Sequence, residues 1–156
     1  MKMAEAACLF SDAGCIGRNP STLAGTWCWC QISSDGLLGR HDCGIVEPQD
    51  IGLPAVTNNL TELLAAVRGL AAMPVDWNGV LYTDSRVTQC RLERGLPCSF
   101  PGVPDWLRQQ LVQLRTARHW RVQLLAGHPT RQETVNGYRL RNGLPVSKWN
   151  QFCDSQ

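Results

Sequence analysis

Apolar and polar residues follow two different periods along this chain, and the periods predict its secondary structure. Three short apolar stretches separated by turn-forming residues have the length expected of β-strands: Ala6–Ser11, Ala24–Ser33 and Leu38–Glu47. The sequence Ser34-Asp35-Gly36 supplies the turn between the second stretch and the third. Close connections of this kind predict an antiparallel meander of three strands.

The spacing then changes to that of a helix. Between Leu60 and Ala71 the apolar residues recur at i, i+3, i+4 and i+7, and Pro74 lies beyond the end of this pattern. A strand, a brief helix, a second amphipathic helix and a last strand follow, with the longer elements expected at Gly79–Thr83, Trp106–Ala117 and Trp120–Leu125. We therefore predict an α/β fold with a five-stranded mixed sheet flanked by helices. It forms a single domain over residues 1–156, in which residues 130–156 are an irregular tail.

Composition narrows the function only slightly. The length of 156 residues and the apolar content of 44% suit one domain with its own core. The net charge of +2 allows a nucleic-acid partner without indicating one. The eight cysteines include no CxxC pair, so we interpret them as reduced thiols, many of them small buried hydrophobic residues. Glu5 and Asp12 interrupt the N-terminal apolar run, and no run is long enough to span a membrane. We expect a cytoplasmic monomer with no membrane partner.

Three carboxylates lie at the boundaries of predicted elements. Asp12 ends the first strand, Glu62 lies in the first turn of the first long helix, and Asp84 ends the fourth strand. Each has a local alternative role, respectively as a turn residue, as the far half of a capping box that starts at Asn59, and as the cap of the next helix. Catalytic groups in such sheets tend to lie where strands end, so together the three favour a shared site.

Four segments carry a resemblance to a known family. The first segment, Asp12–Pro20, begins with a strand-ending Asp and continues with a Gly-containing turn and Asn-Pro. The second, Thr57–Ala66, matches the pattern TNN-x-x-E-L-x-A-A. The third, Tyr82–Ser85, contains T-D-S, and the fourth is Gly127-His128 after the fifth strand. Together they resemble the type 1 ribonucleases H, of the bacterial and phage kind, from about Leu9 to His128. The TNN-x-x-E segment is the most specific of these matches.

The resemblance implies a ribonuclease H fold and an enzyme that hydrolyses the RNA strand of RNA–DNA hybrids with two metal ions, leaving 5′-phosphate and 3′-hydroxyl ends. Asp12, Glu62 and Asp84 would hold Mg²⁺, for which Mn²⁺ is a possible substitute. The fourth carboxylate would be Asp154, in a segment similar to the Asn-x-x-Cys-Asp ending of phage-type relatives. It lies about 25 residues after His128, farther than in familiar bacterial enzymes, so a terminal Asp without this role is the alternative. His128 would assist proton transfer or product release.

The resemblance also implies contacts to the hybrid. Asn19, Asn58, Asn59 and the main chain near Cys15 would sense the 2′-hydroxyl of RNA, with helix capping and turn formation as their alternative roles. Arg86 stands where several relatives carry Gln, and it could instead bind a phosphate. The basic, Trp-rich segment that many bacterial relatives use to hold the DNA strand is reduced here to scattered arginines between Asp84 and Trp120.

Three other interpretations remain open from the sequence. A DNA-specific nuclease of the same fold is one, and a catalytically silent module that binds hybrids is another. The third is an interaction domain with zinc bound by Cys28, Cys30 and Cys43.

Overall fold

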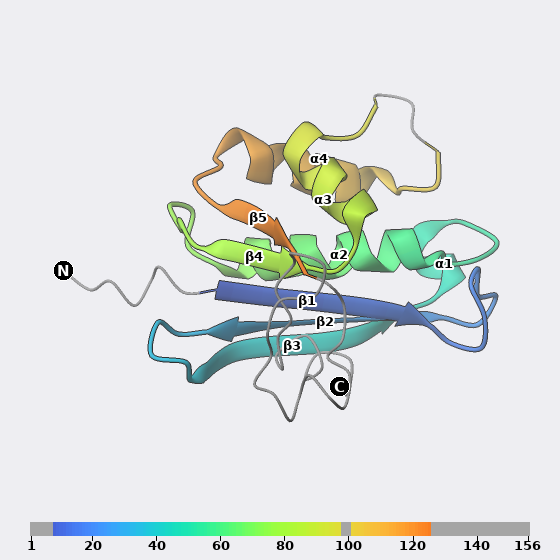
Figure 1. Cartoon of the computed structure of the whole chain (residues 1–156). Coiled ribbons are helices and arrows are strands. Elements are labelled where there is room, and N and C mark those ends of the chain that lie inside the picture. The colour runs from blue at the N-terminus through green and yellow to red at the C-terminus, as the bar shows by residue number, and fades with distance from the viewer. Residues whose placement is uncertain (1–7, 98–100, 126–156) are drawn as a thin grey trace.

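The computed structural model describes residues 8–97 and 101–125 (Figure 1). Five strands form one mixed sheet in the order β3-β2-β1-β4-β5. Strand β1 pairs antiparallel with β2 and parallel with β4, β2 pairs antiparallel with β3, and β4 pairs parallel with β5. The strand bounds are Cys8–Cys15 for β1, Gly25–Ile32 for β2, Leu38–Val46 for β3, Val80–Thr83 for β4 and Arg121–Leu124 for β5. The predicted fold class and the three-strand meander are confirmed.

Four helices accompany the sheet in the described residues, and Figure 1 shows α2 lying along it with α3 and α4 stacked above α2. Their bounds are Pro48–Ile51 for α1, Asn58–Ala72 for α2, Arg86–Arg94 for α3 and Asp105–Thr116 for α4. The three longer helices confirm the predicted ones. Helix α1 is a single turn that the apolar spacing did not reveal, and it begins with Pro48 and ends at Gly52 in the left-handed conformation.

The main hydrophobic core lies between the sheet and the helices. Helix α2 supplies its centre, with Leu60, Leu63 and Leu64 all nearly inaccessible. The helix approaches the sheet closely, because a Cβ added at Gly69 would lie 3.1 Å from the Cβ of Trp29 on β2. A helix buried this completely is fixed in position, and so are the polar side chains that it carries.

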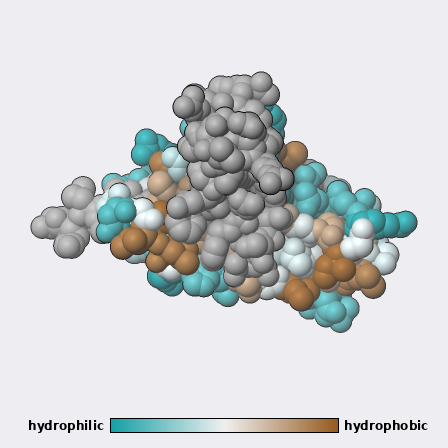
Figure 2. Space-filling model, turned by 60° about the horizontal axis from the view of Figure 1, so that its bottom comes forward, coloured by the Kyte–Doolittle hydropathy of each residue, from teal (hydrophilic) through white to brown (hydrophobic). Residues whose placement is uncertain are grey.

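A smaller apolar cluster lies on the opposite face of the sheet. It contains Phe10, Cys28, Cys30, Ile32 and Leu125, and the ring of Phe10 stacks on that of Tyr82 with centroids 4.9 Å apart. Figure 2 looks toward the underside of the sheet, and in its coloured parts hydrophobic residues are interspersed with hydrophilic ones. Within the described residues, no helix is both long and apolar enough to cross a membrane.

The first strand differs from its predicted extent. It continues through Asp12 to Cys15, and residues 12–15 pair with Gly25–Cys28 of β2. The Asp-Ala-Gly sequence has turn propensity, but the ladder with β2 satisfies its backbone groups and keeps it extended. Asp12 is therefore a residue within a strand and does not end it.

Candidate metal centre

The site lies where two parallel strands separate. The pairing of β1 with β4 ends at Phe10 and Tyr82, and Asp12 and Asp84 each follow two residues later. Beyond that point β1 stays paired with β2, whereas the chain leaves β4 and turns into α3. Strand β1 is also where the sheet changes from antiparallel to parallel neighbours, the kind of switch point at which α/β sheets place their ligands.

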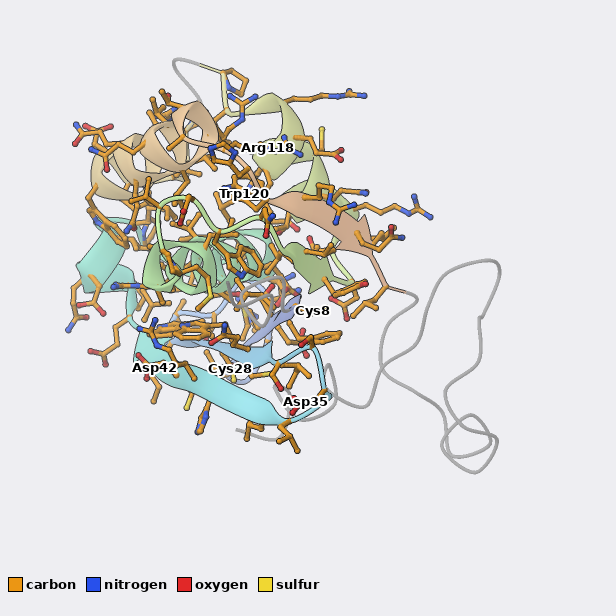
Figure 3. All side chains as sticks on the ribbon, turned by 90° about the vertical axis from the view of Figure 1, so that its left-hand side faces the viewer. Cys8, Cys28, Asp35, Asp42, Arg118 and Trp120 are labelled. Carbon is orange, nitrogen blue, oxygen red and sulfur yellow. The ribbon has the colours of Figure 1, made fainter. Side chains whose placement is uncertain are left out.

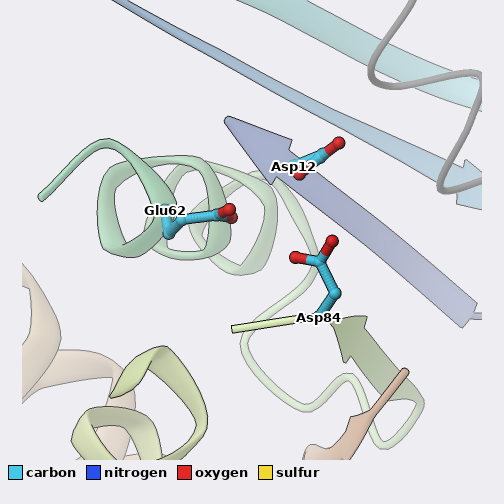
Figure 4. Close-up of side chains that lie close together, drawn as sticks. All are labelled: Asp12, Glu62 and Asp84. Carbon is cyan, nitrogen blue, oxygen red and sulfur yellow. The ribbon is translucent and has the colours of Figure 1, made fainter. Parts of the chain in front are cut away.

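Helix α2 supplies the third acid. Glu62 projects from its second turn, not from the first turn as predicted, toward the two aspartates (Figure 4). One carboxylate oxygen from each of Asp12, Glu62 and Asp84 lies within 4.8 Å of the other two. The three acids that the sequence singled out are thus brought together from a strand, a helix and the residue after a second strand.

None of the three acids has the turn or capping role that the sequence offered as an alternative to a shared site. Asp12 is in a paired strand and not in a turn. Helix α2 is capped by Thr57, whose side chain accepts the N–H of Leu60, so Glu62 is not part of a capping box and Asn59 is not the cap. Ser85 accepts the N–H of Thr88 and caps α3, a role that Asp84 does not share. Secondary structure alone does not explain why acids occupy these positions.

The arrangement is electrostatically unfavourable without a cation. Asp12 and Glu62 are buried, with 4% and 5% of their surface exposed. Burial, together with the charges of Asp12 and Asp84, raises the pKa of Glu62 from its ordinary value of 4.5 to about 10. Its buried Oε1 receives no hydrogen bond from the described residues. Carboxylate oxygens are hard ligands, and a divalent cation such as Mg²⁺ or Mn²⁺ would offset the repulsion among these three acids.

Comparisons with known proteins agree with this topology. No family model matches the sequence, and no curated protein matches it. Among solved structures, RNase H1 of the halophilic archaeon Halobacterium salinarum NRC-1 superposes with a TM-score of 0.62 at 18% identity, over 96% of this chain and 92% of that one. The chain has a ribonuclease H-like fold.

Two more structures support the same assignment of fold. The N-terminal ribonuclease H domain of a Mycobacterium tuberculosis protein matches with a TM-score of 0.58 at 15% identity, over 96% of each chain. LC11-RNase H1, a protein isolated from compost by a metagenomic approach and solved with an RNA/DNA hybrid, matches with a TM-score of 0.57 at 14% identity, over 96% of this chain and 97% of that one. At these identities the similarity establishes the fold, and the activity must be argued from the site.

Beside the acids, the ribonuclease H-like fold gathers three of the residues expected to contact RNA. The side-chain oxygen of Asn19 accepts the main-chain N–H of Asn58 at 2.9 Å. The sulfur of Cys15 lies 3.8 Å from the same oxygen and 3.4 Å from the carbonyl oxygen of Val56. These contacts connect the end of β1 to the first turn of α2, one turn before Glu62. Asn59 is exposed on that same turn.

The remaining predicted site residues have different outcomes. Arg86 is the exposed first residue of α3, next to the Ser85 cap and two residues after Asp84. His128 and Asp154 lie outside the described residues, so their roles stay predictions. The described cysteines and histidines form no group of three that could hold a metal ion, and the zinc interpretation therefore gains no support from them.

Several of the scattered arginines have structural roles that the sequence did not reveal. Arg115 donates to the carbonyl oxygens of Leu92 and Glu93 at 3.1 and 2.9 Å, at the end of α3. Arg108 donates to the carbonyl oxygen of Pro97 at 2.6 Å. Arg118 lies over the ring of Trp120, 4.6 Å from its centroid (Figure 3). Of these three, Arg115 joins α4 to the end of α3, whereas Arg108 and Arg118 bind the segments that precede α4 and β5.

Proposed function

We propose that this protein is a ribonuclease H that hydrolyses the RNA strand of RNA–DNA hybrids with the help of divalent cations. The observation that carries the proposal is the convergence of Asp12, Glu62 and Asp84 within 4.8 Å at the strand divergence of a ribonuclease H-like fold. An acidic cluster in which Asp12 and Glu62 are buried is costly, and such clusters are expected where a cation and a phosphodiester meet.

In this proposal Asp12, Glu62 and Asp84 hold Mg²⁺ or Mn²⁺, with Asp154 as the fourth carboxylate. Bound cations would supply an activated water and stabilise the leaving oxygen of an in-line displacement at phosphorus, which gives 5′-phosphate and 3′-hydroxyl ends. Asp12 is held by the ladder with β2 and Glu62 by the buried helix, so the pair is preorganised for this task. His128 is proposed to move a proton or to speed product release.

Selection of the RNA strand is proposed for the group around Asn19. The hydrogen bond from Asn58 fixes the orientation of the Asn19 amide, whose NH₂ group remains a donor for a 2′-hydroxyl. The side chains of Asn58 and Asn59 and the main chain near Cys15 complete this proposed contact surface, and Arg86 is proposed to reach a phosphate of the hybrid.

The test uses labelled RNA–DNA hybrid, DNA duplex and single-stranded RNA, each with Mg²⁺, Mn²⁺ or EDTA. We expect cleavage of the hybrid alone, dependent on the cation. Replacing a direct metal ligand should cost more than the 10–100-fold that loss of an outer hydrogen-bond partner costs, so Asp12→Asn should lower the rate by at least about 100-fold. The exposed Asp76 provides a matched control, because Asp76→Asn makes the same chemical change outside the site.

The outcomes separate the alternatives. Cleavage of the DNA duplex would favour the DNA-specific nuclease. Binding of the hybrid without turnover in either cation would favour the silent binding module. Equal cleavage in EDTA, or equal loss in Asp12→Asn and Asp76→Asn, would reject the proposal.

A further inference from the structure

Two cysteine residues lie opposite each other on neighbouring strands, in the same cross-strand row as Asp12 of the acidic site. Cys43 on the edge strand β3 is the partner of Cys28 on β2, and Cys28 is in turn the partner of Asp12 on β1. Directly opposed residues of an antiparallel pair point to the same face. Cys43, Cys28 and Asp12 therefore form one row across three strands on one face, and Figure 3 shows Cys28 on its strand beside β3.

The backbone geometry brings the two thiols especially close. The main-chain N–H of Cys43 donates to Oδ1 of Asp42 at 2.9 Å. On an edge strand, an N–H engaged by its own neighbour's side chain points away from the sheet, so Cys43 and Cys28 form a non-hydrogen-bonded pair. Cα atoms in such pairs lie about 4.5 Å apart and the side chains approach most closely. That spacing falls at the short end of the range that disulfides span, about 4.4–6.8 Å.

The two cysteines differ in solvent exposure, as a stepwise thiol–disulfide exchange requires, because a small-molecule disulfide must reach the first of them. Cys43 is exposed, whereas Cys28 is buried with 4% of its surface accessible. Burial raises the pKa of the Cys43 thiol, and the neighbouring Cys28 and Asp42 raise it further, so attack by the Cys43 thiolate becomes faster as the pH rises. Neither cysteine is part of a disulfide in the structure.

We propose that Cys28 and Cys43 are a redox-active pair whose oxidation to a cross-strand disulfide disturbs the acidic site through Asp12. The Cys43 thiolate attacks a small-molecule disulfide such as oxidised glutathione, forms a mixed disulfide and releases one glutathione thiolate. The Cys28 thiol then loses its proton and attacks the Cys43 sulfur, which forms the Cys28–Cys43 bond and releases the second glutathione. Two protein thiols are oxidised and one glutathione disulfide is reduced to two thiols.

The effect of the disulfide on the acidic site follows from the pairing register of β1, β2 and β3. A disulfide needs its Cβ atoms about 3.8 Å apart, closer than the 4.5–5.5 Å of ordinary cross-strand partners, so closure shifts Cys28 relative to β3. Asp12 is the partner of Cys28 on the other side and moves with it. Metal and catalytic groups tolerate displacements of only about 0.5 Å.

Peptide mapping of the full chain tests the disulfide itself. After equilibration in oxidised and reduced glutathione, trypsin should release the peptide of residues 19–40 joined to that of residues 41–68 and two hydrogen atoms lighter than their sum. The first peptide also contains Cys30, which pairs with His41 and not with Cys43. The cross-link should therefore persist in Cys30→Ser and disappear in Cys28→Ser. Its absence from the wild type, or its persistence in Cys28→Ser, would overturn the proposal.

A second measurement tests the coupling and rests on the proposed function. The oxidised wild type should cleave hybrid at least about tenfold more slowly than the reduced form, with recovery in dithiothreitol. Cys43→Ser should retain the reduced rate under both conditions. Unchanged cleavage by a fully cross-linked protein would refute the coupling. If the reduced protein does not cleave hybrids at all, the proposed function fails, while the cross-link result still decides whether the thiol pair exists.

Discussion

Neutralising Glu62 should remove one large contribution to the pH dependence of the stability of the cation-free protein. The folded state holds the pKa of Glu62 at about 10, whereas the carboxyl group has its ordinary value of 4.5 in the unfolded chain. Between these values the unfolded chain has released the proton and the folded chain retains it. A raised pKa contributes stability below pH 4.5, and that contribution is lost as the pH rises toward 10. Glu62→Gln keeps the shape of the side chain and removes the ionisation.

The size of the effect follows from the linkage relation. Each pH unit between the two pKa values lowers the free energy of unfolding by about 1.4 kcal/mol. With part of the unfolded chain still protonated at pH 5, the loss between pH 5 and pH 7 is on the order of 2–3 kcal/mol for this group alone. Because only 5% of the Glu62 side chain is exposed, salt screens this term little. Glu62→Gln should therefore gain on the order of 2–3 kcal/mol relative to the wild type over the same interval.

Urea denaturation in EDTA, followed by the fluorescence of the six tryptophans, measures this difference. The wild type and Glu62→Gln are compared at several pH values, so that titrating groups that do not interact with Glu62 contribute equally to both. Saturating Mg²⁺ supplies a second comparison, because a cation bound at 100 times its dissociation constant adds about 2.7 kcal/mol, and this gain should be larger for the wild type. A difference between the two proteins that stays constant from pH 5 to pH 7 would show that Glu62 is ionised in the folded state and refute the reasoning.

Three further changes test packing, the arginine contacts and the tail. Gly25→Ala places a Cβ 2.3 Å from a methyl group of Thr61 on α2, and chemical denaturation should show a loss of at least about 1–3 kcal/mol. Arg115→Ala removes the donors that hold two carbonyl groups at the end of α3 and should destabilise the fold by about 1–3 kcal/mol, while hybrid affinity changes little. Asp154→Asn should reduce cleavage as strongly as Asp12→Asn if the tail supplies the fourth ligand, and a rate equal to the wild type would remove Asp154 from the site.

Two matched controls accompany the stability measurements. Gly14→Ala adds a Cβ with its nearest contact at an ordinary 3.4 Å, so it should cost less than Gly25→Ala. Arg94→Ala removes an exposed arginine from the last turn of the same helix that Arg115 holds, and its effect should stay within about 0.5 kcal/mol. Equal losses within either pair would show that the specific contacts named here do not matter.

Periodicity was sufficient for most of the fold because the amphipathic patterns are strong. The apolar strands, the repeat from Leu60 to Ala71, and the two helices expected between Asp84 and Trp120 account for eight of the nine elements in the described residues. Helix α1 was missed because one turn is too short to show a period, although Pro48 and Gly52 are typical of the start and end of a helix. The end of β1 was misplaced because its pairing with β2 is a long-range contact that overrides local turn propensity.

The site was harder to predict than the fold. Spacing along the chain placed Asp12, Glu62 and Asp84 near element boundaries, but it could not show that β1 and β4 stop pairing at Phe10 and Tyr82. The family resemblance supplied that expectation, and the structure supplies the geometry. The roles of Arg108 and Arg115 were not predictable, because a guanidinium group that binds main-chain carbonyl groups leaves no motif in the sequence.

The burial of α2 makes the acidic cluster dependent on either protons or cations. Glu62 cannot move away from Asp12 and Asp84, because Leu63 and Leu64 beside it are locked into the core. Repulsion among the acids is then relieved in only two ways, by protonation of the cluster or by a bound cation. The proton and the cation compete for the same carboxylate oxygens. Cation binding must therefore release a proton near neutral pH and must weaken as the pH falls. A cation affinity independent of pH between 6 and 9 would mean that the folded chain already holds Glu62 ionised, in conflict with the geometry of the helix that carries it.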